Sequence, residues 1–322
     1  MRELTRCSDK QRWDTFVSTS PQGSIFCRTD FLDSLGVGYD LLLLEEQGRA
    51  LAGAVLLKDA QGRVLAANHP FCLYQGILLG NHLSAAAPHR RCKEGLELLS
   101  ELLAALAQDH TRLSFCLHHA LDDMRAFSWF HYHQREQGMF ALSPYYTGLI
   151  DLGTTNFDAY VAGIRGCKRR EYRLARQAGL NADISDDIPV LEDLYVQTFA
   201  RQGLHKGAQE RALLRAIAGA ALAGGYGEVL VARLPGGQAV AATLFLHDGH
   251  TGYYLIGANH PDYRNTHAGV LAFLESCRRC RDKGLRFVDV CGINSPNRGD
   301  YKIAFNAVPK VYFVAHWQKS RP

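Results

Sequence analysis

The segment EVLVARLPGGQAVAATLFLHDGHTGYYLIGANHP, residues 228–261, decides the fold of this chain. It contains three runs rich in β-branched and aromatic residues, and the turn-forming groups PGG and DGHT separate them. This pattern predicts the three strands of a meander. A helical stretch follows at residues 267–284, and then comes the apolar run RFVDVCG at residues 286–292. A meander, a helix and one further strand together predict a mixed α/β layer unit.

The same order of elements occurs in the first half of the chain. The runs DLLLLEE, ALAGAVLLKD and RVLAANHP begin at residues 40, 50 and 63, and residues 89–110 and 112–119 have the patterns of a helix and a further strand. Both trios of runs end in ANHP. The matched positions, at nearly constant spacing, are Leu41 with Val229, Leu51 with Ala239, and Val64 with Tyr253. We therefore predict an α/β protein with mixed sheets, in which residues 1–150 and 151–322 form two tandem domains that face a central cleft.

The composition is that of an ordinary globular protein. The chain has 322 residues, of which 47% are hydrophobic and 21% are charged, enough for two domains with their own cores. The formal net charge is only +4, so the overall charge gives no sign of a nucleic-acid binder. Any local basic cluster has to be judged by its position.

Location and metal binding follow from the N-terminus and the cysteines. The N-terminal MRELTRCSDKQRW is polar, and no apolar run reaches the roughly 18 residues that a membrane span needs. Nine cysteines, an odd number, predict reduced thiols and a cytoplasmic protein. Cys277 and Cys280 have CxxC spacing but lie within one helical stretch and have no second pair. The histidines at 118–119 and 131–133 lack cysteines or carboxylates at ligand spacing, so no metal site is predicted.

Positive charge is concentrated in GIRGCKRREYRLARQAGL, residues 163–180, where Glu171 is the only acidic residue. We expect one helix over residues 156–178, with further helices at 189–202 and 208–223. On the first helix Arg165, Arg169, Tyr172 (or Arg173) and Arg176 share one face, because they are spaced by three and four residues. A stripe of one charge suits phosphates, while a solvated amphipathic helix remains the alternative interpretation.

Three stretches resemble a known family. They are RWDTFVSTSPQGSIFCRTDFLDSLG at 12–36, the strand and basic helix at 146–180, and a C-terminal series at 252–307 that ends in GDYKIAFNA. In this order they resemble the FemAB-like branch of the GNAT superfamily, in which a P-x-Y turn, a helix, a strand ending in D-x-x-G and a late Y/F-K-x-x-F succeed one another. The resemblance spans nearly the whole chain, and the order of the motifs makes it specific.

The resemblance implies two GNAT-like domains and the transfer of an acyl group to an amine. Some members, including the peptidoglycan-bridge aminoacyltransferases, take the acyl group from aminoacyl-tRNA, and others take it from acyl-CoA. It implies no tightly bound cofactor, and an acceptor that is an amine-bearing small molecule, peptide or cell-wall precursor. The helical arm of some bridge-building members has no counterpart in this sequence.

Two residues are candidates for catalysis. Lys302 matches the late lysine of the family, and we expect it in a loop after the RFVDVCG strand, where its ammonium can face a phosphate or a developing oxyanion. A surface lysine near a turn is the alternative. Asp289 alternates with valines at a buried strand end, where a carboxylate needs partners. It can accept the proton of the amine, orient Lys302, or serve only as a partner of the turn at Gly292.

The choice of donor depends on residues 263–270. GNAT enzymes that use CoA bind its pyrophosphate through R/Q-x-x-G-x-G/A at a helix start. Here the register gives Arg264-Asn-Thr-His267-Ala-Gly269, with His267 in place of the first glycine, where a side chain would obstruct close approach of the pyrophosphate. This departure and the basic helix favour aminoacyl-tRNA, with acyl-CoA as the alternative.

The remaining candidates are binding residues. For the donor or its phosphates they are Arg165, Lys168, Arg169, Arg173, Arg176, Arg264 and Tyr301. For the acceptor they are Tyr74, Gln75, Tyr254 and Asn259. The leading hypothesis is an acyltransferase that forms an amide with an aminoacyl group from tRNA. A GNAT-like protein that binds an anionic ligand without chemistry is the remaining alternative.

Overall fold

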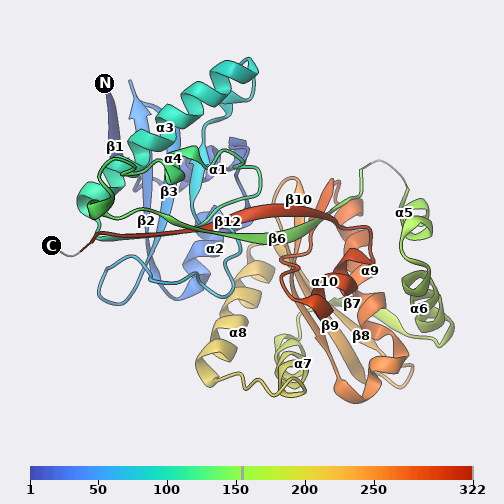
Figure 1. Ribbon diagram of the computed structural model, residues 1–322. Helices are drawn as coiled ribbons and strands as arrows, with labels where there is room; N and C mark the ends of the chain where they lie inside the picture. The colour runs from blue at the N-terminus through green and yellow to red at the C-terminus, as the bar shows by residue number, and fades with distance from the viewer. Residues whose placement is uncertain (154–155, 321–322) are drawn as a thin grey trace. The chain divides into compact units, whose positions relative to one another are not determined.

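The computed structural model describes residues 1–153 and 156–320, apart from the side chains of residues 297 and 298 (Figure 1). The chain forms two compact units. Unit 1 comprises Met1–Tyr145 and the C-terminal segment from Val311, and unit 2 comprises Tyr146–Lys310. The boundaries fall inside strands β6 (Ala141–Asp151) and β12 (Val308–Gln318). The domain division expected at residue 150 therefore lies close to the first boundary, whereas the C-terminal segment returns to unit 1.

Unit 1 is built on an antiparallel sheet of order β1-β2-β3-β4. Its strands are β1 (Arg2–Arg6), β2 (Gly38–Glu46), β3 (Arg49–Lys58) and β4 (Ile77–Leu79). Helix α3 (Pro88–Asp109) buries a row of leucines at helical spacing, among them Leu98, Leu102 and Leu106, in one core with β3. Strand β5 (Arg112–Cys116) pairs antiparallel with residues 314–318 of β12, and the short α4 (Arg125–Ser128) packs against α3.

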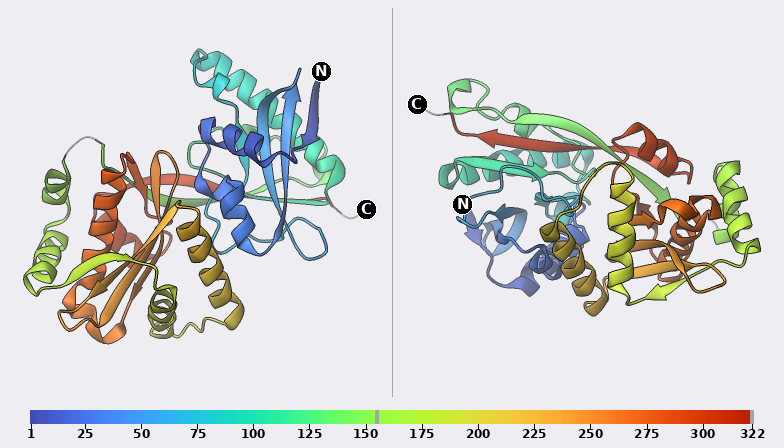
Figure 2. Two further views of the ribbon diagram at one scale, coloured as in Figure 1. Left: turned by 180° about the vertical axis from the view of Figure 1, so that it is seen from behind. Right: turned by 90° about the horizontal axis from the view of Figure 1, so that it is seen from below.

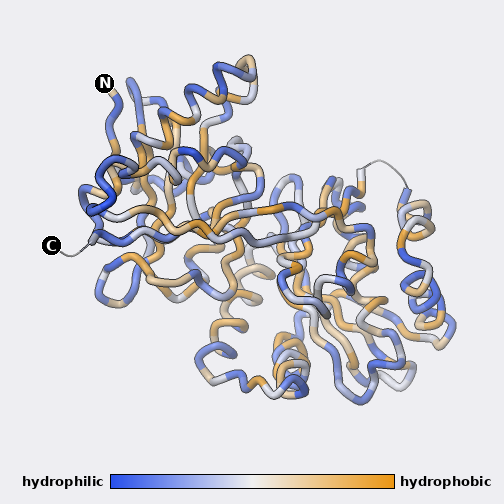
Figure 3. The backbone as a smooth tube through the Cα atoms, in the orientation of Figure 1, coloured by the Kyte–Doolittle hydropathy of each residue, from blue (hydrophilic) through white to orange (hydrophobic). Residues whose placement is uncertain are grey.

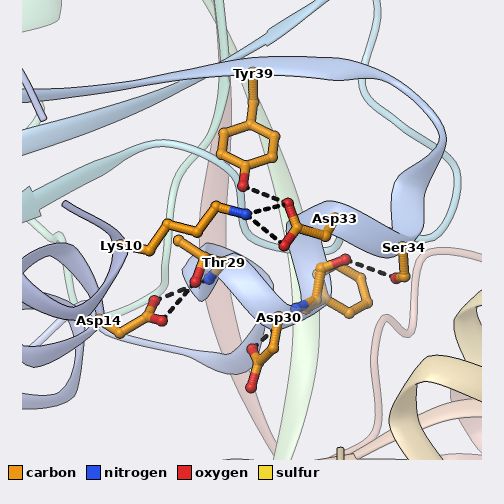
Figure 4. Close-up of polar contacts among 8 residues, drawn as sticks. Lys10, Asp14, Thr29, Asp30, Asp33, Ser34 and Tyr39 are labelled. Carbon is orange, nitrogen blue, oxygen red and sulfur yellow. Dashed lines mark hydrogen bonds and ion pairs between the residues drawn. The ribbon is translucent and has the colours of Figure 1, made fainter. Parts of the chain in front are cut away.

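The N-terminal helices of unit 1 are held by polar contacts (Figure 4). Helix α1 (Lys10–Thr19) is tied to α2 (Thr29–Leu32), because the carboxylate of Asp14 accepts hydrogen bonds from the backbone and the hydroxyl of Thr29. Asp33, just after α2, accepts from Lys10 and from the hydroxyl of Tyr39 at the start of β2. Although burial opposes it, these two partners lower the pKa of Asp33. The predicted helix at the Trp-x-x-Phe-Val motif is thus present and anchored.

The prediction of a third strand at RVLAANHP in the first half is wrong. Only Val64 makes an isolated bridge, to Lys58, and the third strand of the meander is β4 instead. Proline lacks an N–H donor, and the ring of His69 accepts the N–H of Phe71 locally in place of a ladder bond. The match of Val64 to Tyr253 and the shared ANHP therefore do not reflect equivalent strands.

Unit 2 contains a sheet of order β6-β11-β10-β9-β8-β7. Its remaining strands are β7 (Asn181–Ser185), β8 (Gly227–Arg233), β9 (Ala239–His247), β10 (Thr251–Asn259) and β11 (Phe287–Asp289). Its helices are α5 (Phe157–Gly163), α6 (Gly166–Gln177), α7 (Ile188–Ala200), α8 (Ala208–Ala223), α9 (Ala268–Asp282) and α10 (Pro296–Ile303). Helices α7 and α8 lie on one face of the sheet and α9 lies on the other (Figure 2). The predicted α/β class with mixed sheets and the predicted meander, helix and strand of this half are confirmed.

The basic segment forms two helices instead of one. Between α5 and α6, Ile164 is extended and buried, and the N–H of Arg165 donates to the carbonyl of Ala304. The two glycines that flank this break, Gly163 and Gly166, weaken a continuous helix. The single helix predicted over residues 156–178 is therefore wrong, although α6 itself is strongly hydrophilic (Figure 3).

The remaining helices follow the prediction closely. Asp187 caps α7 and Pro189 lies in its first turn, where a missing N–H costs nothing. Over the described ranges, 1–153 and 156–320, no helix is both long and apolar enough to cross a bilayer.

Candidate functional site

The site in unit 2 begins where two parallel strands part. The parallel pairing of β10 with β11 ends at Tyr253 opposite Asp289, whereas β10 continues alongside β9 to Asn259. A bulge in β10 between Tyr254 and Ile256 marks this point. The sheet is therefore open on one side of β10 beyond Tyr254, next to the loop that follows β11.

Lys302 points into this loop. It lies on α10, not in the loop where the sequence was expected to place it, and its ammonium donates to the carbonyls of Val290 and Gly292, the latter at 2.9 Å. The ring of Tyr254 lies 5.4 Å from the same nitrogen. Burial raises the pKa of the Tyr254 hydroxyl, so this group remains neutral near pH 7. The predicted residues Lys302 and Tyr254 are thus brought together.

Asp289 has no exposed surface and orders the loop. Its carboxylate accepts the hydroxyl of Thr147 and the N–H of Cys291, the latter at 2.8 Å. Thr147 comes from β6, and its oxygen accepts the N–H of Gly292 at 3.1 Å. Burial and the nearby Asp289 raise the pKa of Cys291 well above its usual value, against the effect of Lys302, so this cysteine is a thiol at neutral pH.

An open pocket of about 540 Å³ adjoins Lys302. Its lining is mostly polar or small: Gln202, Cys291, Gly292, Asn294, Ser295, Pro296 and Lys302. Gln202 follows α7, whose Thr198 holds the end of β10 by bonding to both the N–H and the carbonyl of Asn259. The pocket is therefore lined by the loop after α7, the loop after β11 and the start of α10.

Two of the predicted phosphate-binding residues instead hold α10. Arg165 forms an ion pair with Asp300 at 2.9 Å, and Lys168 lies 4.7 Å above the ring of Tyr301 while pairing with Glu171. Asp300 and Tyr301 directly precede Lys302 on α10. These cations and Tyr301 therefore support the helix that carries Lys302.

The other basic residues of α6 face solvent. Arg169, Arg173 and Arg176 are exposed and lie on one face of the helix. Arg264, in the 3₁₀ turn Pro261–Thr266, is also exposed. Tyr172 does not belong to this face, because it is buried against α9, where its hydroxyl bonds to Glu275. Of the two residues that the sequence allowed at this point of the basic stripe, Tyr172 is excluded and Arg173 lies there.

The start of α9 is closed by the chain itself. His267 has φ of 61°, and its carbonyl accepts from Val270 and Leu271. A Cβ on Gly269 would lie 2.1 Å from the Oδ1 of Asn259, so the Asn259 amide packs directly against the first turn. Further N–H groups of the segment bond within it, including those of residues 262, 263 and 267.

The two predicted acceptor residues of unit 1 are interior. Tyr74 and Gln75 are each 1% exposed. Tyr74 packs against the rings of His118 and Tyr312, and the Gln75 amide donates to the carbonyl of Ser114. In this structure neither offers surface to a ligand, and their assignment to acceptor binding stays a prediction.

Gly257 provides a test of the site. A Cβ at this position would lie 1.6 Å from the hydroxyl oxygen of Tyr254, so any side chain must displace the ring that faces Lys302. We expect Gly257→Ala to lower activity at least tenfold, measured per molecule of folded protein because the ring of Tyr254 also belongs to the core. The matched control is Gly249→Ala in the hairpin before β10, where nothing lies within 4 Å. Equal activity of the two variants would contradict the role of Tyr254.

Sequence reasoning missed Thr147, Gln202, Asn294 and Ser295. Thr147 follows two tyrosines on a strand, and nothing in that pattern marks it as a partner of Asp289. The others lie in loops whose contacts depend on the tertiary fold. In the part of the chain that the structure describes, no group of three His, Cys, Asp or Glu side chains is arranged to hold a metal. Cys277 and Cys280 are buried in α9, and burial raises the pKa of both thiols.

Comparison with known proteins relates this geometry to a superfamily. Residues 163–302 match a family model described as "Acetyltransferase (GNAT) domain". This range includes α6, the β8–β10 meander, α9, β11 and Lys302. No curated protein sequence matches the chain.

Several solved structures share the fold of the whole chain at low identity. One described as "Crystal structure of FemX" has a TM-score of 0.72 at 14% identity, and the match covers 97% of this chain and 96% of that one. A tandem GNAT protein from the clavulanic acid biosynthesis pathway has a TM-score of 0.57 at 14% identity, with 100% and 99% covered. L-PGS from Bacillus licheniformis gives 0.54 at 13% identity, with 98% and 93% covered. The tandem GNAT fold predicted from the sequence is therefore shown.

Proposed function

We propose that this protein forms an amide by transferring an aminoacyl group from aminoacyl-tRNA to an amine-bearing acceptor, since residues 163–302 match a GNAT acetyltransferase family model. The FemAB-like proteins that the sequence resembles include enzymes with this donor. The single observation that carries the choice of donor is the closed start of α9, where His267 replaces a glycine and the Asn259 amide packs against Gly269.

The chemistry follows from Lys302 and its surroundings. A neutral amine attacks the ester carbonyl, a C–N bond forms, the C–O bond to the terminal ribose breaks, and the proton of the amine ends on the released hydroxyl. The positive charge of Lys302, held at the pocket by Val290 and Gly292, stabilises negative charge on the carbonyl oxygen. The protonated thiol of Cys291 is a poor nucleophile, which favours direct aminolysis without an enzyme-bound acyl group.

The closed α9 argues against a CoA donor. Binding a pyrophosphate at a helix start needs backbone N–H groups directed at the anion and close approach of the backbone. Here His267 stands where the motif has a glycine, and the side chain of Asn259 lies against the first turn at Gly269. The exposed arginines of α6 offer a separate surface for the phosphates of a polynucleotide.

An acyl-CoA donor is the second candidate, since the matching family model describes acetyltransferases. Thermal unfolding in the presence of each donor separates the two, because a ligand that binds the folded state raises Tm. We expect total aminoacylated tRNA to raise Tm. CoA or acetyl-CoA should leave Tm unchanged at about 1 mM, the upper end of typical KM values. A rise with acetyl-CoA and none with tRNA would reverse the choice of donor.

Transfer itself is measured with the same charged tRNA pool. Radiolabelled aminoacyl-tRNA is incubated with the full chain and a peptide that carries a free lysine amine, and mass spectrometry detects the amide product. Binding of tRNA without transfer to any amine tested would favour the non-catalytic alternative.

A further inference from the structure

The loop after β11 has a strained backbone that something must hold. Cys291 has φ of 53° and Gly292 has φ of 98°, so two successive residues lie in the left-handed region. For a residue with a side chain this conformation is unfavourable, because its Cβ comes too close to the neighbouring carbonyl oxygen. The surrounding contacts therefore have to compensate for Cys291.

A buried pair of side chains supplies that compensation. Asp289 accepts the N–H of Cys291, and it also accepts the hydroxyl of Thr147, whose oxygen in turn accepts the N–H of Gly292. Both side chains have no exposed surface. The single hydroxyl of Thr147 thus joins Asp289 to the backbone of Gly292, three residues past the end of β11.

The consequence of this conformation is the position of Lys302. With Cys291 and Gly292 turned in this way, the carbonyls of Val290 and Gly292 both meet the same ammonium. The loop is also tied to β6 at both ends, since the N–H of Val290 donates to Gly148 and that of Ile293 donates to Tyr146. Strand β6 therefore fixes the location of the charge through the loop.

We propose that Thr147, acting with Asp289, is a positioning residue that fixes the ammonium of Lys302 at the wall of the pocket. Neither residue touches the substrate, because both are fully buried. Asp289 thus acts by holding the loop and does not accept the proton of the amine. The kinetic part of this inference rests on the proposed function, whereas the positional part does not.

The test compares three threonine variants. Thr147→Val removes the hydroxyl and keeps the shape of the side chain, while Thr147→Ser retains the hydroxyl. The matched control is Thr243→Val on β9, because Thr243 is also buried and bonds to Ser276 of α9 at 2.8 Å, away from the loop. If Thr147→Val fails to fold, Asp289→Asn replaces it.

The first readout needs no activity. Acylation of each lysine by an amine-reactive reagent is followed over time by peptide mass spectrometry. We expect the labelling rate of Lys302 to change at least threefold in Thr147→Val, and to stay as in the parent protein in Thr147→Ser and Thr243→Val. An unchanged rate at Lys302 in Thr147→Val overturns the inference, whatever the activity.

The second readout is steady-state transfer. A displacement of about 1 Å at a reacting group can cost roughly 100-fold in rate, so we expect kcat of Thr147→Val to fall 10- to 100-fold with KM nearly unchanged. Thr147→Ser should recover most of it. A loss no larger than that of Thr243→Val at equal Tm overturns the inference. If labelling of Lys302 changes in Thr147→Val but the parent protein shows no transfer activity, the positioning role is supported and the proposed function is contradicted.

Discussion

Replacing Lys302 by methionine is expected to lower kcat for aminoacyl transfer about 100- to 1,000-fold, the range seen when one group that stabilises an oxyanion is removed. Methionine keeps an unbranched apolar stem against the ring of Tyr254 but carries no charge. The carbonyls of Val290 and Gly292 lose a charged partner, so some loss of stability accompanies the kinetic effect. Single-turnover transfer from charged tRNA, measured beside Tm, separates the two effects.

The control for this variant is Lys310→Met. Lys310 lies in the same unit on β12 but is exposed. Lys310→Met removes the same charge as Lys302→Met and should leave kcat unchanged. Lys302→Arg restores the charge, but a planar guanidinium fits two converging carbonyls poorly, so we expect only partial recovery. If Lys302→Met transfers as fast as Lys310→Met, the charge at this position has no part in the reaction.

The sequence indicates the elements of unit 2 well because their signals are local. The runs of β8, β9 and β10 are separated by glycine-rich turns, and the helix-start and helix-stop residues of α7 and α8 lie near the observed ends. The first half is harder to predict, since a loop that contains a proline can have as many apolar residues as a short strand. Val64 starts such a segment and pairs through one bridge only.

The site is only partly visible in the sequence. Lys302 and Tyr254 are candidates from motif order alone, and the fold brings them together. Their surroundings depend on contacts between residues distant in sequence. Thr147 and Asp289 are separated by 142 residues, and no local pattern connects them. Pairings of this kind are set by the register between β6 and β11, which composition and periodicity do not specify.

The basic segment shows how packing divides residues that look equivalent. Helical spacing places several of its arginines on one face of a continuous helix, but the break at Ile164 starts a new helix. Arg165 and Lys168 then lie against α10, where Asp300 and Tyr301 neutralise or cover them. These two cations therefore have protein partners on α10, and their assignment to phosphate binding stays a prediction.

The exposed arginines of α6 give the second large expected effect. The triple variant Arg169→Gln, Arg173→Gln and Arg176→Gln should weaken tRNA binding about 100-fold, because each cation lost removes one phosphate contact. The slope of log K against log salt concentration should fall by about 2, since each contact to a single strand contributes roughly 0.7. Filter binding across a salt series measures both quantities.

A matched triple variant decides whether this is a local effect. Helix α3 carries three exposed cations near its start, Arg90, Arg91 and Lys93, and their replacement by glutamine changes the net charge equally. If tRNA is held by the face of α6, the α3 variant keeps its affinity and its salt slope, whereas equal losses in both would mean that only total charge matters. Arg165→Gln adds a further distinction, because its partner is Asp300 on α10. It should lower kcat through Lys302 and leave the salt slope of tRNA binding unchanged, so a fall in the slope would return Arg165 to the phosphate-binding surface.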